Sequence, residues 1–290
     1  VTHNSLPIAD QMSDTMPKHP SPVGSCVTHM HIFEPGYTVL PGTNLPAIPG
    51  NTAEYRKLRA RLGITRTVIV QPAAYGNDNR CTLEAMKALA DDMHQTRGVA
   101  VVFPGDSDAE IARLTAAGIR GIRYHLLPYG GVSWDTLNEM AARVAPHGWH
   151  VQLQMNGEEL AGREAMLKAL PCDIVIDHIG RFTQPIAADD PAWKVMRRLV
   201  DSGRCWVKLS APYHGSKTGA PRYEDAGNTA KELIRAAPER MLYATNWPHP
   251  SLKSNHPDDA GLLDLLNDWA GSEAARQKIL VSNPAKLYGF

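Results

Sequence analysis

The sequence lacks a long hydrophobic run, an excess of charge of either sign and any clustering of cysteines. No apolar stretch approaches the ~18 residues that a membrane-spanning helix requires. Thirty lysines and arginines balance thirty aspartates and glutamates, and no long run of one sign occurs, so neither nucleic acid nor an anionic membrane is expected as a partner. A small molecule is the expected partner, and the sequence specifies no oligomeric state.

The four cysteines stand far apart with no CxxC spacing, which favours reduced structural thiols over a disulfide framework or a zinc cluster: Cys26, Cys81, Cys172 and Cys205. The start of the chain is polar and proline-rich and has no apolar stretch like that of a signal peptide, so we expect a cytoplasmic protein. We also expect a loosely packed arm over residues 1–24. A single catalytic domain over residues 25–290 should follow, because 290 residues with 43% hydrophobic content can bury one large core.

Short β-branched runs alternate with longer amphipathic segments, which predicts eight successive βα units. The expected strands are Cys26–Phe33, Thr67–Gln71, Val99–Phe103, Gly121–His125, His150–Met155, Ile174–His178, Trp206–Leu209 and Leu242–Asn246. The expected helices are Thr52–Leu62, Thr82–Gln95, Ser107–Ala117, Trp134–Ala145, Glu158–Leu170, Pro191–Ser202, Tyr223–Ala236 and Asp258–Ala270, followed by a short ninth helix, Glu273–Val281.

Eight parallel strands with eight helices close most simply into a distorted (β/α)₈ or TIM barrel of the α/β class, with its active site at the carboxyl ends of the strands. The alternative is an open doubly wound sheet. Such a sheet usually carries a glycine-rich phosphate loop after its first strand, and residues 31–36 contain no GxGxxG pattern. The barrel is therefore the favoured fold.

Polar side chains at the predicted strand ends should converge on one cavity at that rim. They are His29, His31, Gln71, Arg123, His125, Gln154, Asn156, His178, Arg181, Lys208, Ser210, Asn246 and His249. Because side chains two residues apart on a strand point to the same side, His29 and His31 should face the cavity together. Barrel hydrolases hold a divalent ion with such a pair.

The carboxylates that normally accompany such a histidine pair are missing. Val27 stands where a metal site needs an aspartate ahead of the pair, and Asn246 stands where a last-strand aspartate would bind the ion and act as base. An amide cannot carry a proton away at neutral pH. We therefore expect no metal and no other cofactor, although three neutral imidazoles can bind zinc in principle.

Several motifs resemble the amidohydrolase superfamily, and in particular its branch containing 2-pyrone-4,6-dicarboxylate lactonase and the galactarolactone isomerases. The similarity covers nearly the whole chain after the arm and is carried by His29–His31, Gly118–Arg123, Asp177–Arg181, Thr245–Pro250 and Ser282–Tyr288. The resemblance implies a distorted (β/α)₈ barrel, a sugar-acid lactone as substrate and a place in galacturonate catabolism. In the lactonase the last-strand aspartate activates water, a role that Asn246 leaves vacant.

That vacancy favours an isomerase that converts a sugar-diacid 1,5-lactone, of the D-galactaro type, into the 1,4-lactone. The substrate's own hydroxyl attacks the carbonyl, and this proximity alone can contribute ~7 kcal/mol or more. We expect His29, His31 and His178 to polarise the carbonyl or move protons and Asn246 to orient a hydroxyl. Substrate should bind to Gln71, Arg123, Gln154, Arg181 and His214, with Arg123 pairing to a carboxylate.

Three alternatives remain open at this point. The first is a metal-independent lactonase in which His178 replaces the aspartate as base. The second is an ordinary hydrolase in which Asn246 replaces a native aspartate. The third is a sugar-acid binding protein without catalysis.

Overall fold

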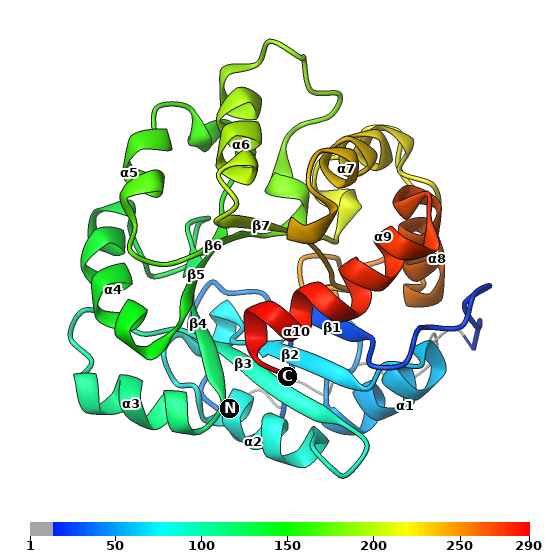
Figure 1. The fold of residues 1–290 in the computed structure, drawn as a ribbon. Coiled ribbons are helices and arrows are strands. Elements are labelled where there is room, and N and C mark those ends of the chain that lie inside the picture. Colours follow the sequence, from blue (N-terminus) through cyan, green and yellow to red (C-terminus); the bar gives the residue numbers. More distant parts are fainter. Residues whose placement is uncertain (1–13) are drawn as a thin grey trace.

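A computed structural model describes residues 14–290 and contains eight parallel strands in a single sheet that curls into a nearly closed barrel (Figure 1). Each strand pairs with the next along the chain, in the order β1 to β8. The strands are β1 (Cys26–Met30), β2 (Arg66–Val70), β3 (Gln95–Ala100), β4 (Ile119–His125), β5 (His150–Gln154), β6 (Ile174–Ile176), β7 (Cys205–Leu209) and β8 (Met241–Tyr243). The predicted barrel is confirmed.

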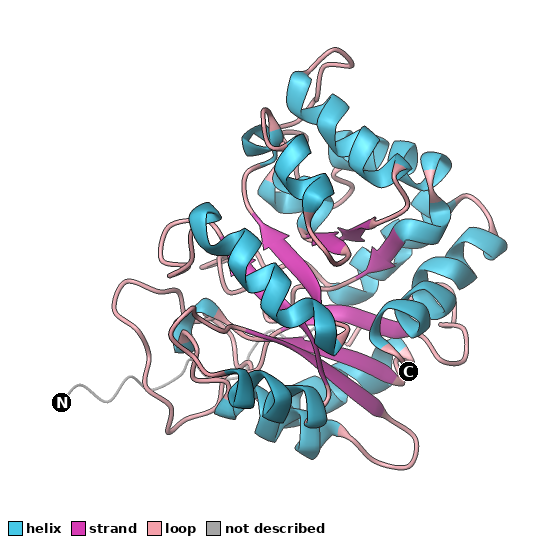
Figure 2. Ribbon diagram, turned by 60° about the vertical axis from the view of Figure 1, so that its left-hand side comes forward, coloured by secondary structure: helices cyan, strands magenta, loops and turns pink. Residues whose placement is uncertain are grey.

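Helices surround the strands on the outside of the barrel (Figure 2). They are α1 (Thr52–Leu62), α2 (Arg80–Leu89), α3 (Asp108–Ala116), α4 (Leu137–Val144), α5 (Glu164–Ala169), α6 (Pro191–Asp201), α7 (Glu224–Ala236), α8 (Asp259–Ala270), α9 (Glu273–Gln277) and α10 (Asn283–Tyr288). Side-chain caps begin several of them, as where Asn51 accepts a hydrogen bond from the Glu54 N–H at the start of α1. No helix within residues 14–290 is long and apolar enough to cross a membrane.

Three predicted helices differ from the observed ones. The helix expected over 82–95 ends at Leu89, because the Asp91 side chain accepts hydrogen bonds from the next turn and the chain from Gln95 onward pairs as β3. The helix expected over 158–170 is interrupted at Gly162, which has a φ of 77° and leaves α5 only six residues. The ninth helix continues past residue 281 through a π-helical turn, Lys278–Ser282, into α10.

The seam between β8 and β1 is bridged by the segment that follows β8. The Asn246 N–H donates to the His29 carbonyl at 2.9 Å, and the His31 N–H donates to the Trp247 carbonyl at 2.8 Å. Strand β8 itself is shorter than predicted and ends at Tyr243. These two hydrogen bonds place Asn246 directly beside the histidine pair.

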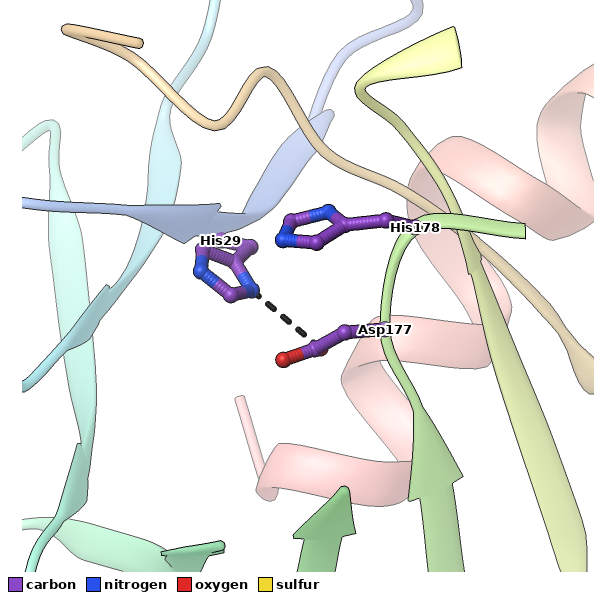
Figure 3. Close-up of side chains that lie close together, drawn as sticks. All are labelled: His29, Asp177 and His178. Atoms are coloured by element: carbon purple, nitrogen blue, oxygen red, sulfur yellow. Dashed lines mark hydrogen bonds and ion pairs between the residues drawn. The ribbon is translucent and has the colours of Figure 1, made fainter. Parts of the chain in front are cut away.

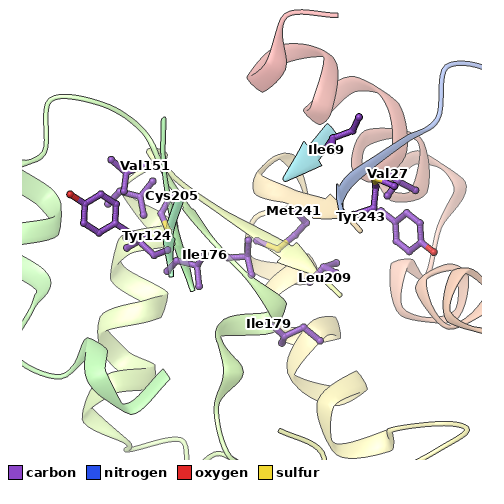
Figure 4. Packing of buried hydrophobic residues seen from close by; sticks show 14 of the residues in the cluster. Val27, Ile69, Tyr124, Val151, Ile176, Ile179, Cys205, Leu209, Met241 and Tyr243 are labelled. Atoms are coloured by element: carbon purple, nitrogen blue, oxygen red, sulfur yellow. The ribbon is translucent and has the colours of Figure 1, made fainter. Parts of the chain in front are cut away.

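Two apolar clusters fill the fold. The larger one lies mainly between strands and helices and includes Val27, Met30 and Met241 (Figure 4). The smaller one lies inside the barrel and consists of Cys26, Val68, Val70, Val99, Val175, Trp206, Leu242 and Tyr288. Tyr288 comes from α10, which lies across one end of the barrel (Figure 1). At the carboxyl ends of the strands the inward side chains are mostly polar, so the candidate functional groups lie at this end.

The described part of the N-terminal arm is held against the barrel. The Ser21 hydroxyl donates to the Leu62 carbonyl at 2.6 Å, the Lys18 N–H donates to Asp264 at 2.8 Å, and Arg276 donates to the Pro20 carbonyl. These hydrogen bonds anchor residues 14–24, most of which are nevertheless exposed, so loose packing of the arm stays a prediction. Residues 1–13 of the predicted arm lie outside the described residues. The division of the chain at residue 24 stays a prediction.

Asn283 ties α10 to the barrel, and its loss should lower stability. Its amide donates to the carbonyls of Pro238 (2.8 Å) and Met241 (2.7 Å) and is buried. We expect Asn283→Ala to lower the free energy of unfolding by about 1–3 kcal/mol, because both carbonyls lose their buried donor. Urea unfolding of this variant beside Lys286→Ala, an exposed change on the same helix, measures the effect; equal midpoints would contradict it.

Candidate active site

One cavity of about 290 Å³ opens at the carboxyl ends of the strands, and among residues 14–290 no acidic residue lines it. Its lining includes side chains on or after six of the strands: His31 after β1, Arg123 and His125 on β4, Gln154 on β5, Arg181 after β6, His214 after β7 and Asn246 after β8. Loop residues Thr43, Asn44 and Leu127–Tyr129 form part of the wall. The volume is near the lower end of ligand pockets, ~300–1,000 Å³, and suits a small polar molecule.

Arg123 contributes a buried positive charge with no acidic partner. Its guanidinium donates to the Gln71 carbonyl and to the Gln154 side chain, each at 2.5 Å, while its Nε has no partner. Within residues 14–290 it forms no ion pair, so its charge is not neutralised by an acidic side chain of the protein. Burial lowers the pKa of Arg123 to about 10, which leaves it charged at neutral pH.

Arg181 places a second guanidinium in the cavity wall. Its Nε is buried without a partner, and burial lowers its pKa below the usual value. A cavity with two guanidinium groups and no carboxylate attracts anions, because a carboxylate can accept two parallel hydrogen bonds from arginine.

His29 and His31 face each other inside the barrel. Their Nε2 atoms lie 3.1 Å apart, and His31 Nδ1 lies 2.8 Å from the Val70 carbonyl. The His31 pKa falls to about 3, mainly through burial and then through Arg123. The His29 pKa falls well below 6.5, mainly through burial and then through Lys208. Both rings are therefore neutral at pH 7 and available as hydrogen-bond partners or proton carriers.

A buried polar cluster lies against the other nitrogen of His29. Asp177 Oδ1 lies 3.2 Å from His29 Nδ1 (Figure 3). Lys208 Nζ lies 3.6 Å from the same carboxylate oxygen and donates to the Gln152 side-chain oxygen at 2.6 Å. Gln152 in turn donates to Asp177 at 3.0 Å. Burial lowers the pKa of Lys208 to about 8.

His178 presents an unpartnered nitrogen. Its Nδ1 lies 2.8 Å from the Ser210 hydroxyl, and its Nε2 is buried with no hydrogen-bond partner. The ring centroid lies 4.8 Å from that of His29 and 5.2 Å from that of His214. Burial places its pKa well below 6.5, so a lone pair is available on this ring at neutral pH.

A chain of hydrogen bonds orients Asn246. Its amide nitrogen donates to the Tyr213 hydroxyl at 2.8 Å, and this hydroxyl lies 3.0 Å from His249 Nδ1. Because Tyr213 has one proton, it donates to His249, whose Nε2 lies 3.4 Å from Asp259. The side-chain oxygen of Asn246, an acceptor, and its second amide N–H remain for other partners.

The backbone at these positions is unusual. Asn246, His178, Arg181 and Ala211 have φ values of 62°, 56°, 51° and 46°, in the left-handed region that non-glycine residues rarely adopt. They follow β6, β7 and β8 at the same end of the barrel. Such strain costs about 1–3 kcal/mol per residue and concentrates at functional sites.

Most predicted site residues converge, but not all of them reach the cavity. Those that line it are His31, Arg123, Gln154, Arg181, His214 and Asn246. His29 and His178 are buried beside this group and do not line the cavity. Gln71 does not line the cavity either: its amide donates to the carbonyls of Gly76 and Asp78, and its oxygen accepts from Thr82, so its contact with substrate stays a prediction.

Sequence analysis gave no role to three residues that support the site. Asp177 and Gln152 contact Nδ1 of His29, and Tyr213 accepts a hydrogen bond that orients Asn246. Asp177 is the first residue of the motif Asp177–Arg181, and Gln152 lies two residues before Gln154 on the same face of β5. The sequence therefore indicated that both could lie near the site. Tyr213 lies in the loop after β7 and has no such signal.

A barrel of this kind, with a histidine pair after its first strand and polar groups at the carboxyl ends of the others, defines a class of enzymes. The amidohydrolase family model matches residues 26–290, and the chain belongs to that family. The chain is 35% identical to D-galactarolactone isomerase of Agrobacterium fabrum, covering 96% of this chain and 95% of that protein. It is 33% identical to 2-pyrone-4,6-dicarboxylate hydrolase of Comamonas testosteroni, covering 94% and 92%. A crystal structure of an Agrobacterium tumefaciens protein matches with a TM-score of 0.87 at 34% identity, covering 94% and 98%.

The histidine pair raises the question of whether these residues fit a divalent ion. His29, Asp177 and His178 each offer a ligand atom within 4.8 Å of the others (Figure 3). However, Asp177 already faces the Lys208 ammonium at 3.6 Å, and that ammonium lies 3.5 Å from His29 Nδ1. A divalent ion between these atoms would lie against a buried positive charge.

The cavity side offers no anionic ligand either. Burial and then Arg123 lower the pKa of His31, and a cation bound there would face the Arg123 charge. After β8 the cavity lining contains the side-chain amide of Asn246, which is a neutral ligand. The residues present therefore do not fit the metal centre of a metal-dependent hydrolase.

Proposed function

We propose that this protein is a lactone isomerase that converts a sugar-diacid 1,5-lactone into the 1,4-lactone without a metal ion. The observation that carries the proposal is the cavity lining, which within residues 14–290 has two guanidinium groups, three imidazoles and three side-chain amides but no carboxylate. The arginines suit an anionic substrate. With no carboxylate in the lining, imidazole is the only base there that could activate water, whereas an intramolecular attack needs no water and only proton movement.

In the proposed reaction the 4-hydroxyl oxygen attacks the lactone carbonyl carbon. A bond forms between that carbon and O4, the bond to O5 breaks, and one proton moves from O4 to O5, so no water is consumed. Arg123 and Arg181 hold the free carboxylate, and the Asn246 oxygen accepts a hydrogen bond from a substrate hydroxyl. Both nitrogens of His31 are engaged by Val70 and His29, so another lining imidazole, of His125 or His214, accepts the proton from O4 and delivers it to O5. A neutral imidazole suits both proton steps near pH 7.

The relatives support action on a lactone. One of them is a lactone isomerase and another hydrolyses a cyclic dicarboxylate ester, and both match nearly the whole chain. Time-resolved NMR with galactaro-1,5-lactone tests the proposal directly: we expect the 1,4-lactone to appear before any open diacid. Open diacid as the first product would overturn it.

Hydrolysis of a dicarboxylate lactone without a metal is the second candidate function. The unpartnered Nε2 of His178 is the observation that favours it, because a buried lone pair could accept a proton from water. Water labelled with ¹⁸O separates the two reactions. A lactonase incorporates one label per product, while intramolecular transfer incorporates none.

Metal independence gives a separate prediction. We expect activity to survive prolonged chelation, and the purified protein to contain well under one equivalent of zinc or manganese, because Lys208 and Arg123 occupy the surroundings of the histidines. Metal analysis and an activity assay before and after chelation measure this. Activity lost on chelation and restored by zinc would contradict the prediction.

A further inference from the structure

The hydrogen bonds of His31 determine which of its nitrogens carries a proton. Its Nδ1 lies 2.8 Å from the Val70 carbonyl, and a carbonyl can only accept. Nδ1 is therefore the protonated nitrogen. Because the His31 pKa is about 3, the ring is neutral at pH 7 and its Nε2 bears a lone pair.

His29 must then supply the proton that lies between the two rings. The Nε2 atoms are 3.1 Å apart, a hydrogen-bond distance that requires one donor. Since His31 Nε2 is the acceptor, His29 Nε2 is the donor. A neutral imidazole has a single N–H, so His29 Nδ1 bears a lone pair.

The groups around His29 Nδ1 favour opposite tautomers. Asp177 Oδ1, at 3.2 Å, favours a proton on Nδ1 because a carboxylate only accepts. Lys208 Nζ, at 3.5 Å, favours a lone pair there because an ammonium only donates, and the Gln152 amide at 3.4 Å does the same. Lys208 also compensates the charge of Asp177 at 3.6 Å. The ammonium thus opposes the carboxylate in two ways.

We propose that Lys208 is a positioning residue that sets the tautomer of His29, keeping the proton on Nε2 and directed at His31. Without the ammonium, Asp177 would draw the proton to Nδ1, and two lone pairs would face each other across 3.1 Å. The rings would then separate or take up another proton. His31 lines the cavity, so its displacement would reach the substrate.

The charge of Lys208 depends on groups from four other strands. Burial lowers its pKa to about 8, Asp177 after β6 and Cys26 on β1 raise it, and Arg123 on β4 lowers it further. His29 on β1, with Gln152 and His150 on β5, completes the surroundings. The ammonium is present below pH 8 and is lost above it. Raising the pH through 8 should therefore move the proton of His29 from Nε2 to Nδ1.

Nitrogen-15 NMR of the full chain with labelled histidines tests the tautomer without substrate. His29 is assigned by comparison with His29→Gln. We expect His29 to be protonated on Nε2 at pH 7 and to shift toward Nδ1 above pH 8 in the unaltered protein. Lys208→Met should show Nδ1–H already at pH 7, while the exposed control Lys194→Met should match the unaltered protein.

A proton on His29 Nδ1 at pH 7 in the unaltered protein would overturn the proposal, as would the same tautomer in Lys208→Met. The pH series is recorded on the unaltered protein and needs His29→Gln only to assign the signals, so it decides the question even if Lys208→Met does not fold.

The kinetic arm rests on the proposed function. With galactaro-1,5-lactone, we expect Lys208→Met to lower kcat about 100-fold, within the range of lost acid–base catalysis, while KM changes less than about twofold. In the unaltered enzyme, kcat should fall as the pH rises through 8. An unchanged kcat in a variant with a switched tautomer would remove the catalytic consequence. If the unaltered protein does not act on the lactone, the proposed function fails while the tautomer result stands.

Discussion

Replacing Arg123 with alanine is expected to raise KM for a sugar-diacid lactone by about 30-fold or more. An anionic substrate would lose a buried guanidinium, and a desolvated carboxylate without its partner costs about 2–5 kcal/mol. At about 1.4 kcal/mol per factor of ten, the lower end of this cost corresponds to a rise in KM of about 30-fold. Initial-rate kinetics over a range of lactone concentrations measures it. Because Arg123 is proposed to pair with the carboxylate of the substrate, KM should change more than kcat.

Two further variants define what Arg123 contributes. Arg123→Lys should recover only part of the loss, because a single ammonium cannot reproduce the paired contacts of a guanidinium. Arg113→Ala removes an arginine whose partner is the exposed Glu110 on the same helix, and KM should stay unchanged. An Arg123→Ala enzyme with normal KM would show that the residue only supports Gln71 and Gln154.

Asn246→Asp is expected to shift the product from rearranged lactone toward open diacid. The new carboxylate could accept a proton from water. Within residues 14–290 the cavity of the unaltered protein has no carboxylate in its lining. Isomerisation should fall as well, because a carboxylate cannot donate to Tyr213 and would compete with His249 for the single Tyr213 proton. The added negative charge should also raise KM for the anionic substrate.

The product ratio from NMR is the decisive measurement for this variant. Asn156→Asp makes the same chemical change at an exposed position after β5 and should leave the ratio unaltered. If Asn246→Asp isomerises as before and forms no diacid, then position 246 does not determine the reaction. Exclusion of water would then depend on the shape of the cavity and on the loops that cover it.

The barrel was predictable because its signals are local and repeat along the chain. Runs such as Thr67–Val70 are apolar on successive residues, as expected for a strand covered on both sides, and helix α1 was predicted with its observed bounds. The errors arose where side chains or glycine overrode the helical pattern, as at Asp91 and Gly162.

The histidine pair shows where periodicity alone fails. Cys26 faces the barrel interior while Val27 and Met30 face the helices, so strict alternation from Val27 would turn His29 outward. A register irregularity in β1 between Val27 and Met30 turns it inward instead. The pairing of β1 with β2 decides this orientation, and no pattern in the local sequence records it.

The sequence by itself determined the order of strands and helices, the family resemblance and the chemical types at the strand ends, because these depend on residues close together in the chain. Only the tertiary structure decided which of those groups share the cavity. It left Arg123 without an acidic partner, assigned Gln71 to its own loop and brought Lys208 and Asp177 together beside His29. These outcomes depend on distances between strands far apart in sequence, where burial and hydrogen bonding set the state of each side chain.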